Sequence, residues 1–478
     1  MKTKLLVIII LFISQQNFAQ WAQVGNDIDG DAAYDYSANS DQLSISGDGS
    51  IVAISAPDND VNGGTSGKVK VFKNVNDTWQ QIGGDLNGEA IGDYFGSGID
   101  LSKNGNVLAV GIPGADALVN NSDNGEIKVY INSNDSWVQF GSTINGNGIG
   151  GSIGSDIALN ANGSIVATCL SNTINIYYFT GVDWNLAHEI HLNGERNFLN
   201  GESLEFNDVG DVLIVGNNLY NGDNDGTEDG RVMVFQNISG VWSMKGNSII
   251  GVDEQGYFGS SVTISGDGNM IAFGSPYSEV GGNIEAGFAR VYKYESNDWV
   301  QVGNDLTGKV ESINFGRSVS LNTDGTALAV GSSGRGEFGA SRGIAQIYNL
   351  ENNSWNQISS TIVGEASKDD FGSSIALSDN GAIVAVGGSY NDGGGINSGH
   401  VRVYKNDLLT LSTTEHNVEK LVFEIVKRKV VANLENVEIH VFNALGQQIA
   451  NENLKKGVYI LMAKNSEGKI QRSKIIVN

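Results

Sequence analysis

The sequence has few of the residues that cross-link or stiffen a chain. Its 478 residues include one cysteine and three prolines. A single cysteine excludes an intramolecular disulfide framework, and the apolar, strand-like run SIVATCL around Cys169 favours a small buried side chain over a reactive thiol. Stretches with a helical apolar period are nearly absent, whereas glycine occurs 64 times. These features together predict an all-β chain with many tight turns.

Long hydrophobic runs are missing after the N-terminus. Within residues 1–19, Lys2 and Lys4 precede an apolar run at 5–13, and the segment 17–19 (NFA) offers a cleavage point. This pattern predicts a secretory signal peptide. The apolar run is too short to anchor a mature protein, so no transmembrane segment is expected in the mature chain. No cysteine follows the expected cut, which argues against a lipoprotein.

Positive charge is scarce over most of the chain. Residues 20–405 carry 17 Lys and Arg against 46 Asp and Glu, a net charge of −29. Such a field repels nucleic acid and anionic lipid, and it favours cations and basic partners. We therefore expect no nucleic-acid partner. An acidic, solvated surface without any partner is the plainer alternative.

Tryptophan is confined to one point of an internal repeat of roughly 55 residues, a length typical of propeller blades. A second anchor is a glycine in an Asp-Gly or Asn-Gly type of turn between two short apolar runs, as in SVTIS-GDG-NMIAFG. This form predicts a β-hairpin with a positive-φ turn. The tryptophans are Trp21, Trp79, Trp137, Trp184, Trp242, Trp299 and Trp355, and the glycines are Gly49, Gly105, Gly163, Gly210, Gly268, Gly325 and Gly381.

The order of these pieces predicts how the ring closes. Each repeat supplies a hairpin, a third strand and a fourth strand that contains the tryptophan, which is a four-stranded blade. The chain begins with a fourth strand at Trp21 and ends, after Gly381, with three strands and no tryptophan. We therefore predict a seven-bladed β-propeller over residues 20–405 that is closed by its N-terminal strand. The tryptophans are expected between blades, as packing residues.

The repeats also carry a Phe-Gly pair before the turn glycine and a proline after it. In these features the chain resembles the FG-GAP repeats of the integrin α head. That resemblance implies a propeller that binds extracellular partners. The calcium loop of that family lies in the first hairpin, and turns such as SGDGNMI lack its closing acid, so calcium is not implied there. The pairs are Phe95-Gly96, Phe258-Gly259, Phe315-Gly316 and Phe371-Gly372, and the prolines are Pro57, Pro113 and Pro276.

A different loop has the spacing of a calcium site. Asn221, Asp223, Asp225 and Asp229 place oxygen ligands at positions 1, 3, 5 and 9, with a glycine at position 6. Calcium is therefore the one cofactor that the sequence suggests. A poorer copy begins at Asp58. An acidic, glycine-rich loop without metal is the alternative for both.

The long loops of the repeats are expected on one face of the ring. They are second turns, and alternating strand direction places second turns together with the links between blades. We expect the ligand at this face, because variable loops on a rigid ring are usual binding sites. The aromatic residues within the loops are Tyr220, Tyr277, Phe338 and Tyr390, and the loops are 57–67, 113–125, 217–230, 276–287, 332–343 and 388–399.

Signals for catalysis are weak. Residues 150–154 (GGSIG) fit G-x-S-x-G, but they precede a strand and no helix follows. His188 and His191 lie three apart in a predicted strand, so their side chains point to opposite faces. No carboxylate pair is singled out for glycoside hydrolysis. No catalytic residue is therefore assigned.

The repeat stops after Lys405. Residues 406–420 read as a linker, and short apolar runs follow in 421–478. Segments 441–447 (VFNALGQ), 454–459 (LKKGVY) and 474–477 (KIIV) resemble, closely, the type A C-terminal sorting domain of the type IX secretion system of Bacteroidetes. The resemblance implies a small β-sandwich that is recognised by that machinery and removed outside the cell.

These patterns lead to one functional expectation and two alternatives. We expect a non-catalytic binding or adhesion propeller, secreted or held at the outer cell surface, whose partner is an extracellular protein or glycan. The alternatives are a propeller-scaffold enzyme that acts on glycans and a purely architectural surface protein.

Overall fold

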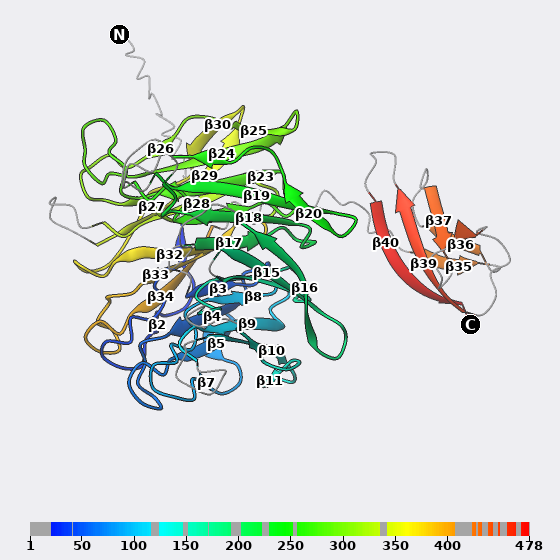
Figure 1. Ribbon diagram of the computed structural model, residues 1–478, viewed down its shortest axis with the longest axis horizontal. Helices are drawn as coiled ribbons and strands as arrows, with labels where there is room; N and C mark the ends of the chain where they lie inside the picture. Colours follow the sequence, from blue (N-terminus) through cyan, green and yellow to red (C-terminus); the bar gives the residue numbers. More distant parts are fainter. Residues whose placement is uncertain are drawn as a thin grey trace, which may run out of the picture. The chain divides into compact units, whose positions relative to one another are not determined.

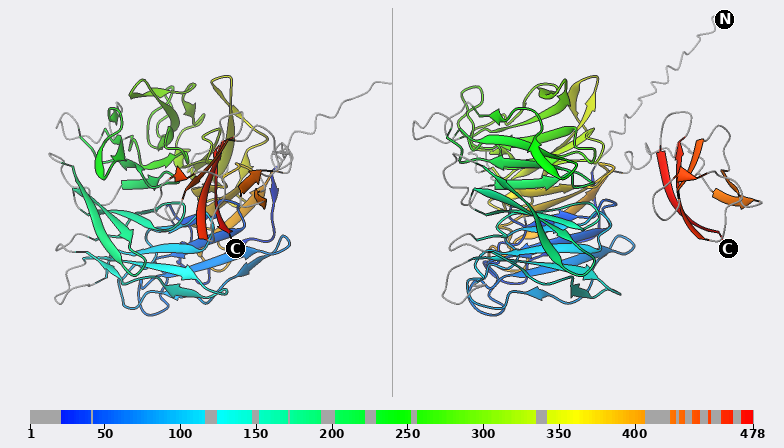
Figure 2. Two further views of the ribbon diagram at one scale, coloured as in Figure 1. Left: turned by 90° about the vertical axis from the view of Figure 1, so that its right-hand side faces the viewer. Right: turned by 45° about the vertical axis from the view of Figure 1, so that its right-hand side comes forward.

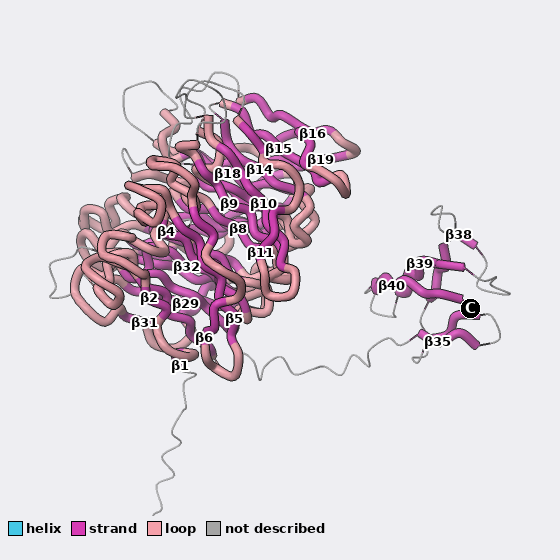
Figure 3. Tube along the Cα trace, turned by 90° about the horizontal axis from the view of Figure 1, so that it is seen from below, coloured by secondary structure: helices cyan, strands magenta, loops and turns pink. Residues whose placement is uncertain are grey.

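The computed structural model describes two compact units, residues 1–410 and 411–478. It describes residues 21–477 apart from 41, 116–123, 147–151, 171, 193–201, 222–228, 252–255, 335–341, 407–422, 427–428, 433–437, 443–447, 450–456 and 465–469. Over 423–477 the description is of the strand backbone. None of the described residues forms a helix long and apolar enough to cross a membrane, and Figure 3 shows strands and loops only.

The first unit contains seven antiparallel sheets, which follow one another around a ring (Figures 1 and 2). Contacts between neighbouring innermost strands run through all seven sheets and return from the last sheet to the first. The predicted seven-bladed propeller is therefore confirmed. The innermost strands are β3 (Leu43–Ile45), β8 (Ile99–Leu101), β13 (Ile157–Leu159), β17 (Glu202–Phe206), β22 (Ser261–Ile264), β27 (Phe315–Leu321) and β32 (Phe371–Leu377).

The second strands are buried on both faces. Each lies inside its blade, and the neighbouring blades of the ring cover the two faces of that blade. This position explains their continuous apolar sequences, such as VLAVGI. They are β4 (Ile51–Ala56), β9 (Val107–Ile112), β14 (Ile165–Leu170), β18 (Val212–Asn217), β23 (Met270–Ser275), β28 (Ala327–Ser332) and β33 (Ile383–Gly388). The third strands are β5 (Lys68–Asn74), β10 (Glu126–Asn132), β15 (Thr173–Phe179), β19 (Arg231–Ile238), β24 (Phe288–Glu295), β29 (Ile344–Glu351) and β34 (His400–Lys405).

The fourth strand of most blades is split, and both pieces pair with the same third strand. Blade 3 departs from this pattern, because β16 (Trp184–His191) is one continuous strand with a single irregularity in register. The first pieces are β1 (Ala22–Gln23), β6 (Trp79–Gln81), β11 (Trp137–Gln139), β20 (Val241–Met244), β25 (Asp298–Gln301) and β30 (Ser354–Gln357). The second pieces are β2 (Ile28–Asp29), β7 (Leu86–Asn87), β12 (Ile144–Asn145), β21 (Ile249–Ile250), β26 (Leu306–Thr307) and β31 (Ile362–Val363).

The N-terminal strand closes the ring, as predicted. Ala22 of β1 pairs with Lys405 of β34, and Ile28 of β2 pairs with Val401 of the same strand. Residues from the beginning and the end of the propeller therefore share one sheet.

The repeat anchors have the expected structural roles. The seven turn glycines adopt positive φ values between 67° and 82°. Each also faces the preceding blade: a Cβ at Gly105 would lie 2.5 Å from the Ile51 side chain. The phenylalanines of the Phe-Gly pairs are at most 2% exposed, and the glycines after them adopt positive φ values.

The tryptophans join neighbouring blades, which confirms the packing interpretation. Trp299, for example, is 8% exposed, and its indole N–H donates to the backbone oxygen of Lys245 in the preceding blade at 2.6 Å. Five tryptophans donate in this way, namely Trp79, Trp137, Trp184, Trp299 and Trp355.

The second unit contains two antiparallel sheets. One pairs β35 (Phe423–Val426) with β36 (Lys429–Ala432). The other has the order β38 (Gln448–Ile449), β37 (Glu438–Phe442), β39 (Gly457–Lys464) and β40 (Ile470–Val477). The strands agree with the expected all-β character, whereas their packing as a sandwich stays a prediction.

Candidate functional site

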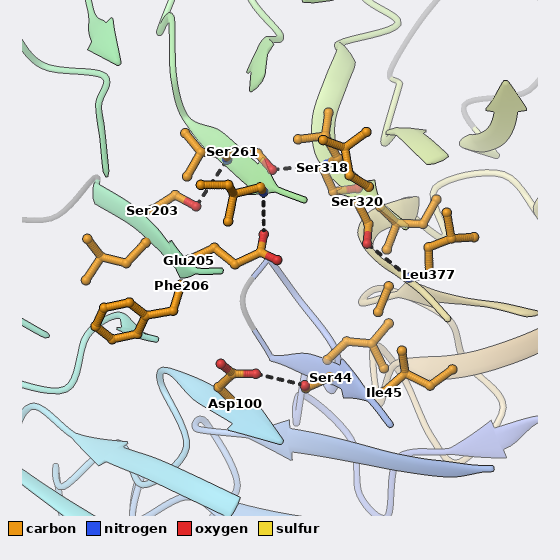
Figure 4. A pocket seen from close by; sticks show the side chains of 18 of the residues that line it. Ser44, Ile45, Asp100, Ser203, Glu205, Phe206, Ser261, Ser318, Ser320 and Leu377 are labelled. Carbon is orange, nitrogen blue, oxygen red and sulfur yellow. Dashed lines mark hydrogen bonds between the residues drawn. The ribbon is translucent and has the colours of Figure 1, made fainter. Parts of the chain in front are cut away.

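The innermost strands surround a cavity of about 400 Å³ along the axis of the ring (Figure 4). One end of this channel lies at the first turns of the blades, and we call it the turn end. The other lies where the innermost strands begin, near the links and second turns, and we call it the loop end. Ser40 and Arg317 line the loop end, where the Arg317 guanidinium donates to the Ser40 hydroxyl at 2.8 Å.

A closed circle of seven backbone hydrogen bonds surrounds the turn end. In each blade, the N–H two residues before the turn glycine donates to the equivalent carbonyl of the next blade, over distances of 2.8–3.3 Å. The circle requires regular blades, because one misplaced turn would break two of its bonds. Its members are Gly47, Lys103, Ala161, Asp208, Gly266, Thr323 and Asp379.

The Lys103 side chain lies across the turn end. Its Nζ atom is 2.6 Å from Asp208 and 2.9 Å from Asp379, and it also donates to the Thr323 hydroxyl. Burial lowers the pKa of Lys103, but the hydrogen bonds and charges of the two aspartates outweigh burial and raise it. Lys103 therefore stays charged and ties four blades together at the turn end.

A second set of inter-blade bonds lies deeper in the channel. The residue five positions before the turn glycine accepts a hydrogen bond from a backbone N–H of the next blade. Ser44, Thr263 and Ser320 do this with a hydroxyl oxygen. Asp100 does it with a carboxylate, accepting from Leu159 at 2.8 Å. Glu205 accepts from Ile264 at 3.2 Å.

Asp100 and Glu205 are the unusual members of this set. Both point into the space between the innermost strands (Figure 4). Burial raises the pKa of Asp100 to about 6, against hydrogen bonds that lower it. Burial, with the charge of Asp100 as a lesser cause, raises the pKa of Glu205 to about 8. The sequence held a signal for both residues, an acid where other repeats have serine, threonine or alanine, but the sequence analysis missed it.

The face of the ring that holds the second turns and the links between blades, which we call the loop face, carries exposed aromatic and aliphatic side chains. Tyr34 is 53% exposed, Tyr94 40% and Tyr277 38%. Among the expected loop aromatics, Tyr390 packs against Tyr36 with ring centroids 5.0 Å apart, and Phe338 lies outside the described residues. Further exposed side chains in these loops and links are Val61, Ile91, Ile284 and Ile396.

Three tyrosines of this face were missed because they lie in links rather than in long loops. Tyr36, Tyr94 and Tyr257 precede the innermost strand at one equivalent position, with φ between 48° and 55°. A bulky residue is disfavoured in this left-handed conformation, whereas Asn and Asp tolerate it. Other blades place Ser152, Asn314 and Asp370 there, with similar φ. The backbone conformation therefore does not require tyrosine at this position. The choice of tyrosine indicates a role for its side chain.

The predicted calcium loop is mostly outside the described residues. Asn221 and Asp229 are described, whereas Asp223 and Asp225 lie within 222–228. Calcium at these four residues therefore stays a prediction. Next to the loop, the guanidinium carbon of Arg231 lies 4.2 Å from the ring centroid of Tyr220.

The poorer copy at Asp58 is closed by its own hydrogen bonds. Asp60 accepts from the backbone N–H of Thr65 at 2.8 Å. The corresponding loop of the last blade has the same bond, from Asn397 to Asp392 at 2.8 Å. That loop has Tyr390 in the place of Asp58, so the turn forms without a carboxylate at that position.

Asp27, Glu365 and His400 offer ligand atoms within 4.8 Å of one another. Arg402 already occupies the carboxylates, with two hydrogen bonds to Asp27 and one to Glu365. A metal ion would meet this guanidinium, so the cluster is an ion pair that ties the N-terminal segment to the last blade. Burial is the main reason why the pKa of His400 is lowered.

The weak catalytic signals gain no support. Ser152 precedes β13, where no helix follows, so the nucleophile elbow is absent from the described part of this segment. His188 packs against Tyr178 and Trp242, while His191 is 3.1 Å from the Thr173 hydroxyl. The two histidines thus have separate neighbours.

No family model and no curated protein matches the chain. Solved structures with a similar fold include a chain of the mitotic checkpoint complex, at 12% sequence identity and a TM-score of 0.49, over 84% of this chain and 99% of that chain. The structure of U3-55K is similar at 11% identity and a TM-score of 0.48, over 81% of this chain and 98% of that chain. Because both TM-scores are below 0.5, the propeller assignment rests on the strand pairing.

Proposed function

We propose that the protein is an extracellular binding propeller, secreted or held at the cell surface, that engages its partner through the loop face without catalysing a reaction. The observation that carries this proposal is the exposure of Tyr34, Tyr94 and Tyr277 on the loop face, where Tyr34 and Tyr94 also have the left-handed backbone conformation. A tyrosine in the left-handed conformation carries a backbone cost that asparagine or aspartate largely avoids. Tyrosine is also one of the residue types that are enriched at the centres of binding surfaces.

The partner class is an extracellular protein or a glycan. Tyrosine rings can stack on sugar rings, and the acidic propeller suits a basic protein surface. The FG-GAP resemblance supports an extracellular binding role, and the C-terminal segments that resemble a type IX sorting domain support export by that route.

The experiment compares three forms of the full chain on glycan and surface-protein arrays. The forms are the wild type, a variant with Tyr34→Ala, Tyr94→Ala and Tyr277→Ala, and a control with Val138→Ala, Val182→Ala and Val241→Ala. The control valines are also exposed but lie in third turns and outer strands. We expect the tyrosine variant to lose more than about tenfold in affinity for any hit, and the control to bind as the wild type does.

Equal binding by the two variants would contradict the loop-face proposal. Turnover of a bound glycan, followed by product release, would instead favour the glycan-active enzyme. A complete absence of hits would favour the architectural alternative.

A further inference from the structure

His400 is a fully buried histidine that makes no hydrogen bond through its ring. The residue is 0% exposed, and neither ring nitrogen has a hydrogen-bond partner among the described residues. Its Nδ1 atom lies 3.7 Å from a carboxylate oxygen of Asp27, which is beyond hydrogen-bond distance. That oxygen already accepts from the Arg402 guanidinium. Because buried polar atoms are nearly always paired in native proteins, the imidazole requires an explanation.

The fold does not require a histidine at this position. His400 is the first residue of its third strand, and the equivalent residues of blades 5 and 6 are Phe288 and Ile344. Each of these is paired with a serine of the second strand, whereas His400 is paired with Gly388. A Cβ at Gly388 would lie 2.9 Å from the Nε2 atom of His400, so the glycine leaves space for the imidazole. What histidine adds over phenylalanine or isoleucine is a change of charge between pH 5 and pH 8.

The imidazole lies in the sheet that closes the ring. Asp29 of β2 is the cross-strand partner of His400, and Asp27 of the same N-terminal segment makes two hydrogen bonds to Arg402 of β34. The ring of Phe371, from the innermost strand, packs edge-on to the imidazole with centroids 6.2 Å apart. His400 therefore has neighbours both in the N-terminal segment and in the inner strands of the last blade.

We propose that His400 makes the closure of the ring sensitive to pH, because protonation of its imidazole at mildly acidic pH weakens the attachment of residues 22–29 to β34. A buried imidazolium needs a hydrogen-bond acceptor. The nearest carboxylate, that of Asp27, is held by Arg402. The charged ring must therefore take Asp27 from Arg402 or gain water through opening of the sheet. Either change costs the closing sheet a contact that the neutral ring leaves in place.

Charges of both signs surround the imidazole, and burial decides between them. Burial, with the charge of Arg402 as a lesser cause, lowers the pKa of His400 below its ordinary value of 6.5, against nearby carboxylates that raise it. The folded state then binds fewer protons than an open state, so the contribution to closure is present above pH 6.5 and is lost as pH falls below it. The charged and titratable groups that face His400 are Asp27, Asp29, Glu365, Asp369 and Arg402.

The carboxylates of this cluster do not produce the same effect between pH 7.5 and pH 5. Burial raises the pKa of Asp27, but its hydrogen bonds, chiefly from Arg402, outweigh burial and lower it. Hydrogen bonds from Asn391 and Arg402 lower the pKa of Glu365. Burial raises the pKa of Asp29, so its protonation stabilises the folded state as pH falls, which is the opposite sign.

The test is hydrogen exchange of the full chain at pH 7.5 and pH 5, measured by mass spectrometry. A metal chelator is present, so that no ion contributes at the cluster of Asp27, Glu365 and His400. Exchange in peptides that cover residues 22–29 and 400–405 is compared with exchange in β23 of blade 5, after correction for the intrinsic effect of pH. The comparison separates opening of the closing sheet from unfolding of the whole ring.

Two variants and one control isolate the histidine. His400→Gln is neutral at both pH values, and His400→Phe copies Phe288 of blade 5. The control, His191→Gln, removes an exposed histidine of β16. Cooperative thermal unfolding at pH 7.5 shows which variants have an intact ring.

In the wild type and the control, acid should speed exchange of the closing sheet severalfold relative to β23. The upper limit is about 30-fold, since an imidazole with a pKa of 6.5 is protonated about 30 to 1 at pH 5. Both His400 variants should lose this selective effect. Its absence from the wild type would overturn the proposal whether or not the variants fold, and so would an equal effect in the wild type and a folded His400 variant.

Discussion

At the scale of single residues, equivalent tryptophans of different blades make different hydrogen bonds. The tryptophans mark every repeat, yet the indole N–H of Trp242 has no hydrogen-bond partner among the described residues. Its preceding blade is blade 3, where β16 runs on as one continuous strand. Five other tryptophans donate to a backbone oxygen of the preceding blade, whereas the indole N–H of Trp21 has no partner among the described residues either. Trp242 therefore offers an internal control for the contribution of that hydrogen bond.

The first prediction uses this control. Trp299→Phe removes a buried hydrogen bond to the Lys245 carbonyl, whereas Trp242→Phe removes only part of a packed ring. We expect Trp299→Phe to cost about 1 kcal/mol more in free energy of unfolding, because the carbonyl is left without its donor. Denaturant titration of both variants measures the difference. Equal losses would show that the hydrogen bond contributes nothing beyond packing.

The second prediction concerns pH. The pKa values of Asp100 and Glu205 in the folded protein are raised above their ordinary values, to about 6 and about 8. The folded state then binds more protons than the unfolded state across this range, so its stability falls as pH rises from about 4 to about 8. The Asp100→Ser and Glu205→Thr variant should lose this part of the pH dependence. Thermal melts of both proteins at pH 4, 6 and 8, without added cation, measure it; parallel curves would contradict the expected role of the two acids.

At the scale of elements, the regular blade is the unit, and its exceptions are informative. Three features recur from blade to blade, namely the split fourth strand, the turn glycine and the Phe-Gly pair. They recur because every blade must turn its chain and pack against a neighbouring blade in the same way. The closing blade is the one made from both ends of the propeller, and Arg402 adds ion pairs to Asp27 and Glu365 there. This sheet should therefore be the most sensitive to loss of a terminal segment.

The third prediction tests that closure. Deleting residues 20–30 removes β1, β2 and Trp21 and exposes the edge of β34. We expect a loss of several kcal/mol in stability, since removing a core aromatic alone costs roughly 3–5 kcal/mol. Hydrogen exchange should also become faster at the amides of β34 that β1 and β2 now pair. An unchanged melting temperature in the truncated protein would contradict closure by the N-terminal strand.

The fourth prediction concerns the loop at Asn221 to Asp229. Three carboxylates and one amide should hold calcium with a dissociation constant on the order of 0.1–1 mM, as in extracellular modules. At ten times that concentration, the expected stabilisation is about 1.4 kcal/mol. Asp225→Ala should abolish the increment and leave the fold intact. Identical melting curves of the wild type in calcium and in chelator would favour an acidic loop without metal.

At the scale of the whole molecule, the propeller and the C-terminal unit divide the functions that we propose. In this proposal the propeller presents the binding face, and residues 421–478 provide the export signal. The boundary between the two units, at residues 410 and 411, falls within the expected linker 406–420, which carries none of the repeat anchors. Removal of one unit should thus leave the other able to fold.

The fifth prediction tests that division in cells. Deleting residues 421–478 should leave a folded propeller that accumulates in the periplasm, because the signal for the second export step is gone. Cell fractionation and protease accessibility measure the location, with the full chain as the control. Continued appearance of the truncated protein outside the cell would refute the sorting role.

The sequence by itself determined the number of blades, the position of each turn and the closure by the N-terminal strand. These follow from local patterns that repeat in register, such as the glycine at each first turn and the tryptophan of each fourth strand. Only the tertiary structure decided which residues meet in the channel. Asp100 and Glu205 are more than 100 residues apart, and they share a cavity because every innermost strand turns the same position toward the axis. The tertiary structure likewise showed that the link tyrosines have a left-handed backbone conformation. That conformation depends on packing between blades, which no single repeat contains.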